Sequence, residues 1–411
     1  MVGVQSKQNC LKCKGRLWCG LNYCPILAKS QAMQMAVRNI DSASFSGSAP
    51  SVFVGRVGYP DVNVGILSTQ EKDSEMYDAP KSWAQKNIPI PDIINFRSSL
   101  INSRFTANVK ERSRFLSISQ EVGMASKPVD LSIDLKEKPK VRLNYVPNAP
   151  PMGPNAKLIK VDLNENPKID KKVDYVVGDV DFKASDAITY LYEKGFDENF
   201  LSRLLSIGNL GVRTDRKLVP TRWSITATDD ALGKKLIEEV KQYSKGAYQF
   251  YYANYLGNHY IILLFPEVWS YELFEMYMPN VGWNVNNTVS FMTDSEGYTG
   301  RKEYAEDCAG GYYTVRLAIL EKMSAMKRQG SALVLRFVTD DYSTPLGVWV
   351  TREAARKVLK TQPIEFDCKE TMLAYTKALV KKKWNFDVDA LYKNSQLLSS
   401  MRNQMKLNAF V

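Results

Sequence analysis

The spacing of hydrophobic and polar residues changes repeatedly along the chain, which predicts a mixture of α-helices and β-strands. In the first part, apolar residues recur every three to four positions and predict helices at residues 28–40, 91–105, 198–209 and 229–243. Apolar and small residues alternate around turn-forming glycines and a proline within 51–67, which predicts a pair of strands. Short apolar or β-branched runs predict strands at 222–228 and 259–265. The stretch 127–167 is rich in proline and asparagine and predicts a long loop.

The same mixture continues to the end of the chain. Helical spacing predicts helices at residues 270–278, 312–329, 351–360, 370–383 and 389–404, and apolar runs predict strands at 287–294 and 332–340. This order predicts an α+β, or mixed α/β, fold in a multi-part globular protein. We expect a small metal-binding knuckle at 1–30, α+β domains at 31–279 and 280–395, and a flexible tail at 396–411.

The overall composition indicates a globular protein with a polyanionic partner. Of 411 residues, 45% are hydrophobic, and 55 Lys and Arg against 44 Asp and Glu leave a net charge of +11. Such a surplus of cations favours contact with a polyanion such as nucleic acid. No apolar run is long enough to span a membrane and the N-terminus lacks the apolar stretch of a signal peptide. We therefore expect a cytoplasmic, nucleoid-associated protein with no membrane partner.

Histidine is nearly absent, which removes most familiar catalytic arrangements. The one imidazole, of His259, would have to serve any Ser-His-Asp triad, Cys-His dyad or HExxH zinc site. It begins the apolar run 259–265, so we interpret it as a structural residue of a buried strand. Any general acid or base is then a carboxylate, a lysine or a tyrosine.

Four of the six cysteines lie together in the segment CLKCKGRLWCGLNYC. Four thiolates can close a tetrahedral shell around one metal ion, and the C-x2-C pair presents two sulfurs from one turn. Two disulfides are the alternative, which a cytoplasmic chain disfavours. We therefore predict a metal site with the ligands Cys10, Cys13, Cys19 and Cys24. Zinc is the first assignment, because basic residues between the ligands would offset the thiolate charge. A [4Fe–4S] cluster is the alternative, since Pro25 follows the last cysteine.

A basic segment with a tryptophan, TDRKLVPTRWSIT, has the composition of a nucleic-acid contact. Guanidinium groups bind phosphates bidentately, and an indole ring offers a face on which a base can stack. The candidate DNA-binding residues are Arg213, Arg216, Lys217, Arg222 and Trp223. An ordinary solvated loop with a core tryptophan is the alternative.

Two carboxylate pairs and a glycine pair are further candidates for chemistry. The carboxylates of VGDVDF and MTDSEG could hold Mg²⁺ for phosphodiester chemistry, although such pairs also serve as turn caps. The glycine pair in DCAGGYYTVR precedes a helix and could bind an anion together with a nearby arginine, and a tight turn is the alternative. The residues concerned are Asp179, Asp181, Asp294, Glu296, Gly310, Gly311 and Arg316.

The final segment, QMKLNAFV, has the pattern of a sliding-clamp ligand. Its glutamine, leucine, phenylalanine and valine are spaced so that one helical or 3₁₀ turn would place three apolar side chains on one face, while the glutamine reaches a polar pocket. The predicted clamp-binding residues are Gln404, Leu407, Phe410 and Val411. Lysines at 381–383, upstream of this segment, would suit an acidic clamp rim or passing DNA.

Several long motifs together resemble those of the archaeal Nre DNA-repair proteins. They are the four-cysteine segment, GRVGYPDVNVG, LVPTRWSIT, WSYELFE, GRKEYAEDCAGGYYTVRLAILE, PLGVWVTRE and the terminal clamp motif, and they extend over nearly the whole chain. The resemblance implies a cytosolic archaeal protein that acts in DNA-damage repair and binds the sliding clamp PCNA through its tail. It also implies two family regions that meet near residue 279, and no catalytic mechanism. One departure is Val411, where clamp-binding motifs often carry a second aromatic residue.

Two hypotheses about function follow. The first is a non-catalytic repair factor that binds DNA and is recruited by PCNA. The alternative is a metal-dependent repair nuclease, or another nucleotide-processing enzyme, that uses Asp or Glu.

Overall fold

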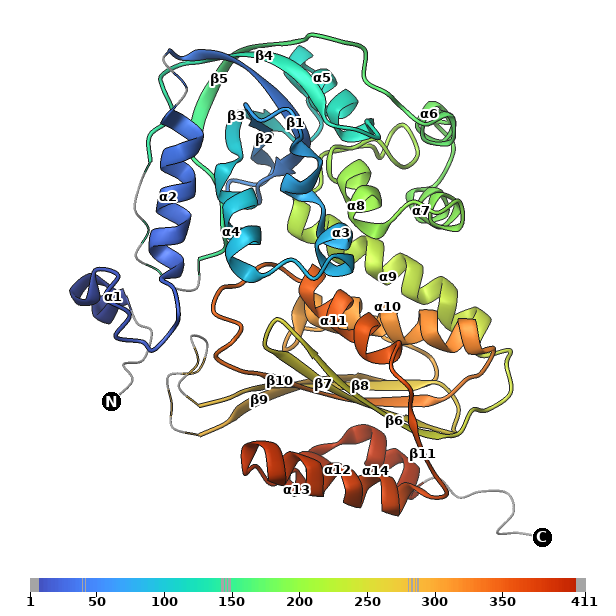
Figure 1. Cartoon of the computed structure of the whole chain (residues 1–411). Helices are drawn as coiled ribbons and strands as arrows, with labels where there is room; N and C mark the ends of the chain where they lie inside the picture. The colour runs from blue at the N-terminus through green and yellow to red at the C-terminus, as the bar shows by residue number, and fades with distance from the viewer. Residues whose placement is uncertain are drawn as a thin grey trace. The chain divides into compact units, whose positions relative to one another are not determined.

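Helices and strands are interspersed throughout the chain, which confirms the predicted α+β class (Figure 1). The computed structural model describes residues 7–403 apart from 39, 41, 142–143, 145, 147–148, 280, 282–283, 285 and 287. The chain divides into two compact units. Unit 1 comprises residues 1–232 and 343–347, and unit 2 comprises residues 233–342 and 348–411. The domain boundaries expected from the sequence stay a prediction.

The centre of unit 1 is a closed five-stranded β-barrel with the strand order β1-β2-β3-β5-β4. Its strands are β1 (Ser44–Val54), β2 (Asp61–Thr69), β3 (Ile101–Asn108), β4 (Val129–Leu135) and β5 (Asn155–Leu163). Neighbouring strands are antiparallel except for β3 and β5, which run parallel. The long strand β1 has an irregularity between Ser48 and Ser51, and it pairs with β4 through its first half and with β2 through its second half. A bulge of this kind bends a strand and allows the sheet to close.

Alternating side chains fill the barrel. In β4 the apolar residues Val129, Leu131, Ile133 and Leu135 are buried, and the polar residues between them are exposed or half-buried. The inward positions of the other strands join them in one apolar cluster with Val122 of α5 (Arg114–Met124). Closure pairs every strand with two neighbours, so the barrel has no open sheet edge.

Helices make up much of the rest of unit 1. They are α1 (Lys7–Cys13), α2 (Pro25–Arg38), α3 (Pro80–Gln85), α4 (Ile90–Ser99), α6 (Lys171–Gly178), α7 (Ala184–Glu193), α8 (Glu198–Ser206), the 3₁₀ helix η1 (Ser74–Asp78) and the first part of α9 (Thr221–Val240). The helix α5 connects β3 to β4, and both α5 and α8 pack against β1. Arg203 of α8 holds these parts together, because its guanidinium donates to the backbone carbonyls of Pro50, Gly123 and Ala125 at 2.7–3.1 Å.

Unit 2 is built on a six-stranded sheet with the order β11-β6-β7-β10-β8-β9. Its strands are β6 (Tyr248–Tyr255), β7 (Asn258–Phe265), β8 (Ser270–Tyr277), β9 (Ser290–Glu296), β10 (Ser331–Val338) and β11 (Ile364–Phe366). The pairs are antiparallel except for β10 with β8. Every residue of β10 is buried, as expected of a central strand with both faces covered.

Helices cover both faces of this sheet. The helices α10 (Ala309–Met326) and α11 (Trp349–Leu359) lie on one face, and α12 (Lys369–Trp384), α13 (Asp389–Asn394) and α14 (Gln396–Asn403) lie on the other (Figure 1). Alternate residues of the strands, such as Leu333, Leu335 and Phe337 in β10, form an apolar core with α12, α13 and α14. Among the described residues, no helix has the length and apolar content needed to span a bilayer.

Five local predictions from the sequence are wrong, and tertiary context explains them. The helix expected at 91–105 ends at Ser99, and its last part forms β3 of the barrel. The expected loop 127–167 contains β4 and β5, because only the connection between them is proline-rich. Residues 222–228 belong to α9 rather than to a strand, and 270–278 contains β8 rather than a helix. The last expected helix, at 389–404, is divided at Ser395 into α13 and α14. Burial in the sheet of unit 2 outweighs the helical spacing of the β8 sequence.

Candidate nucleic-acid interface

The predicted DNA-binding segment lies between α8 and α9 and extends into the first turn of α9. The side chains of Arg213, Lys217, Arg222 and Trp223 are exposed to solvent. Three cations and an indole are therefore accessible on one short segment. The tryptophan is not a core residue, which removes one part of the alternative considered from the sequence.

Arg216, in contrast, is engaged by the protein itself. Its Nε, Nη1 and Nη2 atoms donate to the backbone carbonyls of Gly211, Val177 and Asp179 at 2.7, 2.7 and 2.8 Å. These bonds tie the loop to the C-terminal end of α6. We therefore assign Arg216 to the fold of the loop rather than to contact with DNA.

The carboxylate pair Asp179 and Asp181 lies in the turn directly after α6, to which Arg216 also donates a hydrogen bond. The Oδ1 atom of Asp179 accepts a hydrogen bond from the backbone N–H of Asp181 at 3.0 Å. This is the local capping role that short polar side chains often have in turns. The pair thus has a structural explanation that requires no cation.

Trp223 brings the basic segment next to the barrel. Its ring packs against that of Tyr59 in the β1–β2 loop, with a centroid separation of 5.2 Å and an angle of 57° between the ring planes. The start of α9 is fixed beside β1, because the backbone N–H of Val54 donates to Thr221 Oγ1 at 2.9 Å. Sequence reasoning missed this pair. The signal available was an aromatic residue and an arginine in the turn GRVGYP.

Polar side chains continue from this loop across the outer face of β2, β3 and β5. In the strand register Gly65 lies opposite Arg104, and Arg104 lies opposite Lys157. Arg104 and Lys157 are exposed, as is Arg56 in the β1–β2 loop. Together with Arg222 and the two aromatic residues, these cations form an exposed set that we call the barrel surface. Its members are Arg56, Tyr59, Arg104, Lys157, Arg222 and Trp223. The surface combines aromatic rings with positive charge, as single-strand nucleic-acid sites do.

The four cysteines lie in α1 and in the turns that follow it. The backbone at Lys14 and Gly15 is left-handed, with φ of 48° and 83°, and the backbone N–H of Trp18 donates to Cys13 Sγ at 3.5 Å. Burial raises the pKa of the Cys10 thiol, and charge repulsion from the cysteines at 24, 19 and 13 adds to the rise. The four sulfurs therefore lie in one region, although no group of three or more His, Cys, Asp or Glu in the described chain is placed to hold a metal ion. The metal site stays a prediction.

The second carboxylate pair, in β9 of unit 2, is matched by arginines. Asp294 Oδ1 lies 2.8 Å from Arg301 Nη1, and its Oδ2 accepts from the backbone N–H of Cys308 at 2.8 Å. The buried carboxylate of Glu296 lies 2.8 Å from Arg316 Nη1. Each carboxylate thus has its own cation, and Arg316 binds a carboxylate rather than lining an anion site.

The glycine pair at the start of α10 allows close packing. A Cβ atom at Gly311 would lie 2.7 Å from Glu275 Oε1, and one at Gly310 would lie 3.0 Å from Val348 Cγ1. The absence of a Cβ at these two positions therefore lets the helix pack closely against Glu275 of the sheet and Val348 before α11. Packing, rather than anion binding, explains the pair.

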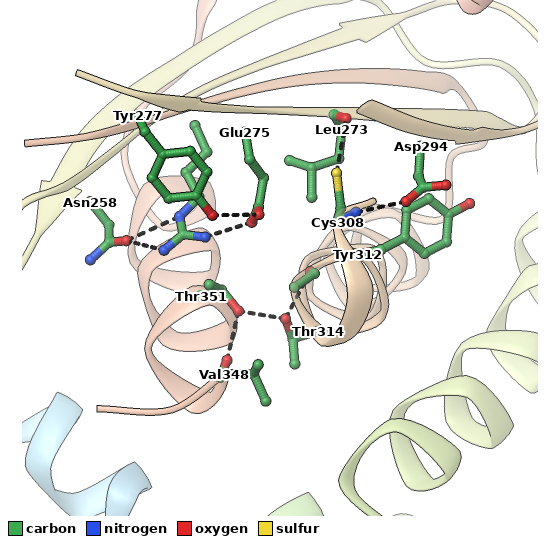
Figure 2. Close-up of polar contacts among 12 residues, drawn as sticks. Asn258, Leu273, Glu275, Tyr277, Asp294, Cys308, Tyr312, Thr314, Val348 and Thr351 are labelled. Atoms are coloured by element: carbon green, nitrogen blue, oxygen red, sulfur yellow. Dashed lines mark hydrogen bonds and ion pairs between the residues drawn. The ribbon is translucent and has the colours of Figure 1, made fainter. Parts of the chain in front are cut away.

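Glu275 belongs to a buried polar network between the sheet and these two helices. Arg336 donates from Nη1 to Glu275 Oε1 at 2.5 Å, and from Nε and Nη2 to Asn258 Oδ1 at 3.0 and 2.6 Å. Figure 2 shows Asn258, Glu275 and Tyr277 grouped below the strands, with the Tyr277 hydroxyl donating to Glu275 Oε2 at 3.3 Å. The charges are opposite and hydrogen-bonded, which is the condition for burying them at all.

His259 has the structural role predicted for it. It lies in β7, where Nδ1 is 2.9 Å from the Tyr252 hydroxyl and the ring also contacts Trp384 edge-on. Burial lowers the pKa of this imidazole, and the nearby Lys383 adds to the effect. The neutral form is therefore favoured at neutral pH.

The predicted clamp-binding residues Gln404, Leu407, Phe410 and Val411 lie outside the described residues. The preceding helix α14 is anchored to β8 by Glu272. Its carboxylate accepts hydrogen bonds from the backbone N–H groups of Gln396 and Leu397 at 3.0 and 3.2 Å, and from the Ser395 hydroxyl at 2.5 Å. Burial raises the pKa of Glu272, and these hydrogen bonds offset part of that rise.

Comparisons with known proteins agree with the resemblance noted in the sequence. Residues 18–284 match the family model described as Archaeal Nre, N-terminal, and residues 296–410 match Archaeal Nre, C-terminal. A protein of Archaeoglobus fulgidus named DNA repair protein NreB is 36% identical over 96% of this chain and 98% of its own length. Two proteins named DNA repair protein NreA are also similar. The one from Haloferax volcanii is 39% identical over 76% of this chain and 77% of its own. The one from Archaeoglobus fulgidus is 36% identical over 93% and 96%. No solved structure matches the chain significantly.

Proposed function

Because the chain belongs to the archaeal Nre family, we propose that it is a DNA repair factor that binds DNA through unit 1 and is recruited by the sliding clamp PCNA through its C-terminal motif. The repair role is supported by three relatives that bear the name DNA repair protein. The clamp partner is supported by the sequence of the tail. DNA binding is supported by the geometry of unit 1, as follows.

The observation that carries DNA binding is the barrel together with its exposed surface. A closed five-stranded barrel with β3 parallel to β5, and a helix between β3 and β4, has the topology of an OB-fold. Barrels of this class bind oligonucleotides or oligosaccharides on the face of strands 2 and 3 and on the adjoining loops. A fold alone does not establish function. Here, however, the β1–β2 loop carries Arg56, β3 carries Arg104 and the adjoining β5 carries Lys157, and these exposed cations favour a polyanion.

The basic segment extends this surface. Arg213, Lys217 and Arg222 are exposed on the segment that leads into α9, next to the β1–β2 loop of the barrel. Phosphate contacts from such residues fix the position of a nucleic acid without reading its sequence. We therefore propose that unit 1 binds DNA with little sequence preference.

We further propose that Cys10, Cys13, Cys19 and Cys24 hold one structural Zn²⁺, with a [4Fe–4S] cluster as the alternative. The chemistry of the donor set suits this ion, since four thiols occur within fifteen residues of the chain and a backbone N–H donates to Cys13 Sγ. A bound ion would supply folding energy to a segment too short to build its own apolar core. The residues of this chain would contribute the thiolates, and a left-handed turn at Lys14 and Gly15 follows the first two cysteines.

Recruitment by the clamp rests on Gln404, Leu407, Phe410 and Val411. Burial of three apolar side chains at about 1.5–3 kcal/mol each, set against the entropy of ordering the tail, predicts micromolar affinity. Phe410 is the aromatic anchor, so its loss is expected to remove most of the affinity.

Salt-dependent DNA binding tests the proposal. The variant Arg213→Ala/Lys217→Ala/Arg222→Ala is compared with wild type and with Lys171→Ala/Lys172→Ala, a control that removes exposed lysines from α6. On duplex DNA each lost phosphate contact lowers the log–log salt slope by about 0.9, so we expect a decrease approaching 2.7 for the triple variant and little change for the control. A triple variant that folds and keeps both affinity and slope would refute the role of this segment. Wild-type protein that fails to bind any DNA would refute the proposal for unit 1.

A further inference from the structure

We propose that the barrel surface binds single-stranded DNA in preference to duplex, with a base stacked on the Trp223 and Tyr59 pair. This inference rests on the proposed DNA-binding function and specifies the form of DNA that the site takes. It is carried by three features of unit 1. They are the exposure of the two rings, the distribution of cations around them, and the continuity of the surface along β2 and β3.

The aromatic pair is exposed to an extent that packing does not explain. Tyr59 is 43% and Trp223 is 45% exposed, and their ring planes are inclined at 57° rather than stacked face to face. Each ring therefore uses only part of its surface in the contact with the other. Contiguous exposed apolar surface is one of the features of binding sites.

The free faces of these rings select for unpaired bases. In a duplex the faces of the bases are already stacked on their neighbours and are not accessible to a side chain. In a single strand they are accessible, and stacking on an aromatic side chain tolerates any base. A pair of exposed rings beside cations therefore favours a single strand.

Each ring of the aromatic pair has an exposed cation close to it in the chain. Arg56 is in the same loop as Tyr59, and Arg222 precedes Trp223 at the start of α9. Gly65 of β2 lies opposite Arg104 of β3. At the usual rise of a strand, the distance along β2 from Asp61, where the strand begins, to Gly65 is about 13 Å. The exposed carboxylate of Asp61, which accepts a hydrogen bond from Asn108, begins this stretch, and positive charge returns at Arg104. The cations of the loop and of β3 are thus spaced to contact separate phosphates of the few nucleotides that one OB-fold binds.

The exposed polar residues of β2 and β3 are compatible with binding DNA of any sequence. Asn63 and Thr106 are exposed opposite one another on β2 and β3, between the loop and Arg104. Their amide and hydroxyl groups can donate or accept hydrogen bonds. We therefore expect a sequence-tolerant site rather than one that reads bases.

The experiment measures the affinity of full-length protein for a fluorescent oligothymidylate of 15 nucleotides and for a duplex of the same length. The variants are Tyr59→Ala, Trp223→Ala and Trp223→Phe, and the matched control is Tyr175→Ala, which removes an aromatic side chain 59% exposed on α6. Loss of one stacking partner is expected to weaken single-strand binding roughly 5- to 140-fold. Trp223→Phe should recover most of it, and duplex affinity and the control should change less than about twofold. The salt slope of Arg56→Ala/Arg222→Ala on the single strand should be smaller by about 1.4.

The outcomes separate this inference from the proposed function. Tighter binding to the single strand, lost in the two alanine variants and kept in Trp223→Phe, supports the inference. Binding to duplex at least as tight as to the single strand, or unchanged affinity in folded alanine variants, overturns it while the proposed DNA binding stands. No binding to either DNA overturns both.

Discussion

The ion pair between Arg336 and Glu275 offers a stringent test of how unit 2 is held together. The two residues lie opposite each other on β10 and β8, and the side chains are 8% and 5% exposed. The perturbation is Arg336→Met, which keeps much of the aliphatic volume and removes the charge. It leaves a buried carboxylate without a cation and Asn258 Oδ1 without two donors.

The expected cost follows from burial. Breaking a buried pair by removing one partner typically costs about 3–5 kcal/mol, because the remaining charge is uncompensated. The second variant, Arg336→Met/Glu275→Gln, removes both charges and leaves an amide that can still accept from the Tyr277 hydroxyl. We expect the double variant to be more stable than Arg336→Met alone by about 2 kcal/mol or more.

The assay is hydrogen exchange measured on peptides from β8 and β10, with peptides from β2 and β3 of unit 1 as the internal control. Exchange of core strands reports the opening free energy of the unit that contains them. A loss of about 3–5 kcal/mol corresponds to acceleration by roughly 150- to 4,000-fold at β8 and β10. The reasoning fails if Arg336→Met exchanges at the wild-type rate there. The single variant Glu275→Gln completes the cycle. The reasoning also fails if the double variant is destabilised by the sum of the changes in Arg336→Met and Glu275→Gln, since that would show no coupling between the charges.

Three further predictions concern other parts of the molecule. Glu272→Ala removes the carboxylate that accepts three hydrogen bonds at the start of α14. Amide hydrogen exchange in α14 should therefore accelerate by the equivalent of at least about 1.5–3 kcal/mol. An unchanged exchange rate would show that α14 is held by its apolar residues alone. Cys13→Ser should lower the zinc content of purified protein from about one ion per chain and expose the segment 10–24 to proteolysis, and full zinc retention would refute the assignment. Gly153→Ala should lower the melting temperature through a loss of about 1–3 kcal/mol, because the added Cβ would lie 1.7 Å from the Leu100 carbonyl, whereas Gly178→Ala, whose Cβ meets nothing within 4 Å, should not.

Sequence patterns predicted the elements that carry their own periodic signal. The run HYIILLF is a buried strand, and the segment AKSQAMQMAVR is a helix, in agreement with the structure. The barrel was not predicted, because two of its strands were assigned to a loop and a third to a helix. Strict alternation in VDLSIDL at 129–135 was an available signal, but the prolines that follow it dominated the interpretation. The parallel pairing of β3 with β5 is a long-range contact that local patterns do not encode.

Only part of the candidate site can be predicted from the sequence, because local patterns indicate which residues are exposed but not which distant residues meet. The spacing of cations around Trp223 indicated an exposed basic segment, and Arg213, Lys217 and Arg222 are exposed. Sequence alone could not show that Arg216 turns inward onto three carbonyls, or that Tyr59 meets Trp223 across more than 160 positions of the chain. Both depend on how α6, the barrel loop and α9 come together in the folded unit.

The most direct test of the central claim is to locate bound DNA on the protein. Full-length protein is photocrosslinked to a bromouracil-substituted single strand, and the crosslinked peptides are identified by mass spectrometry. We expect crosslinks at Tyr59 and Trp223, in peptides of the β1–β2 loop and the start of α9. Crosslinks confined to unit 2, for example to the lysines of α12, would contradict it.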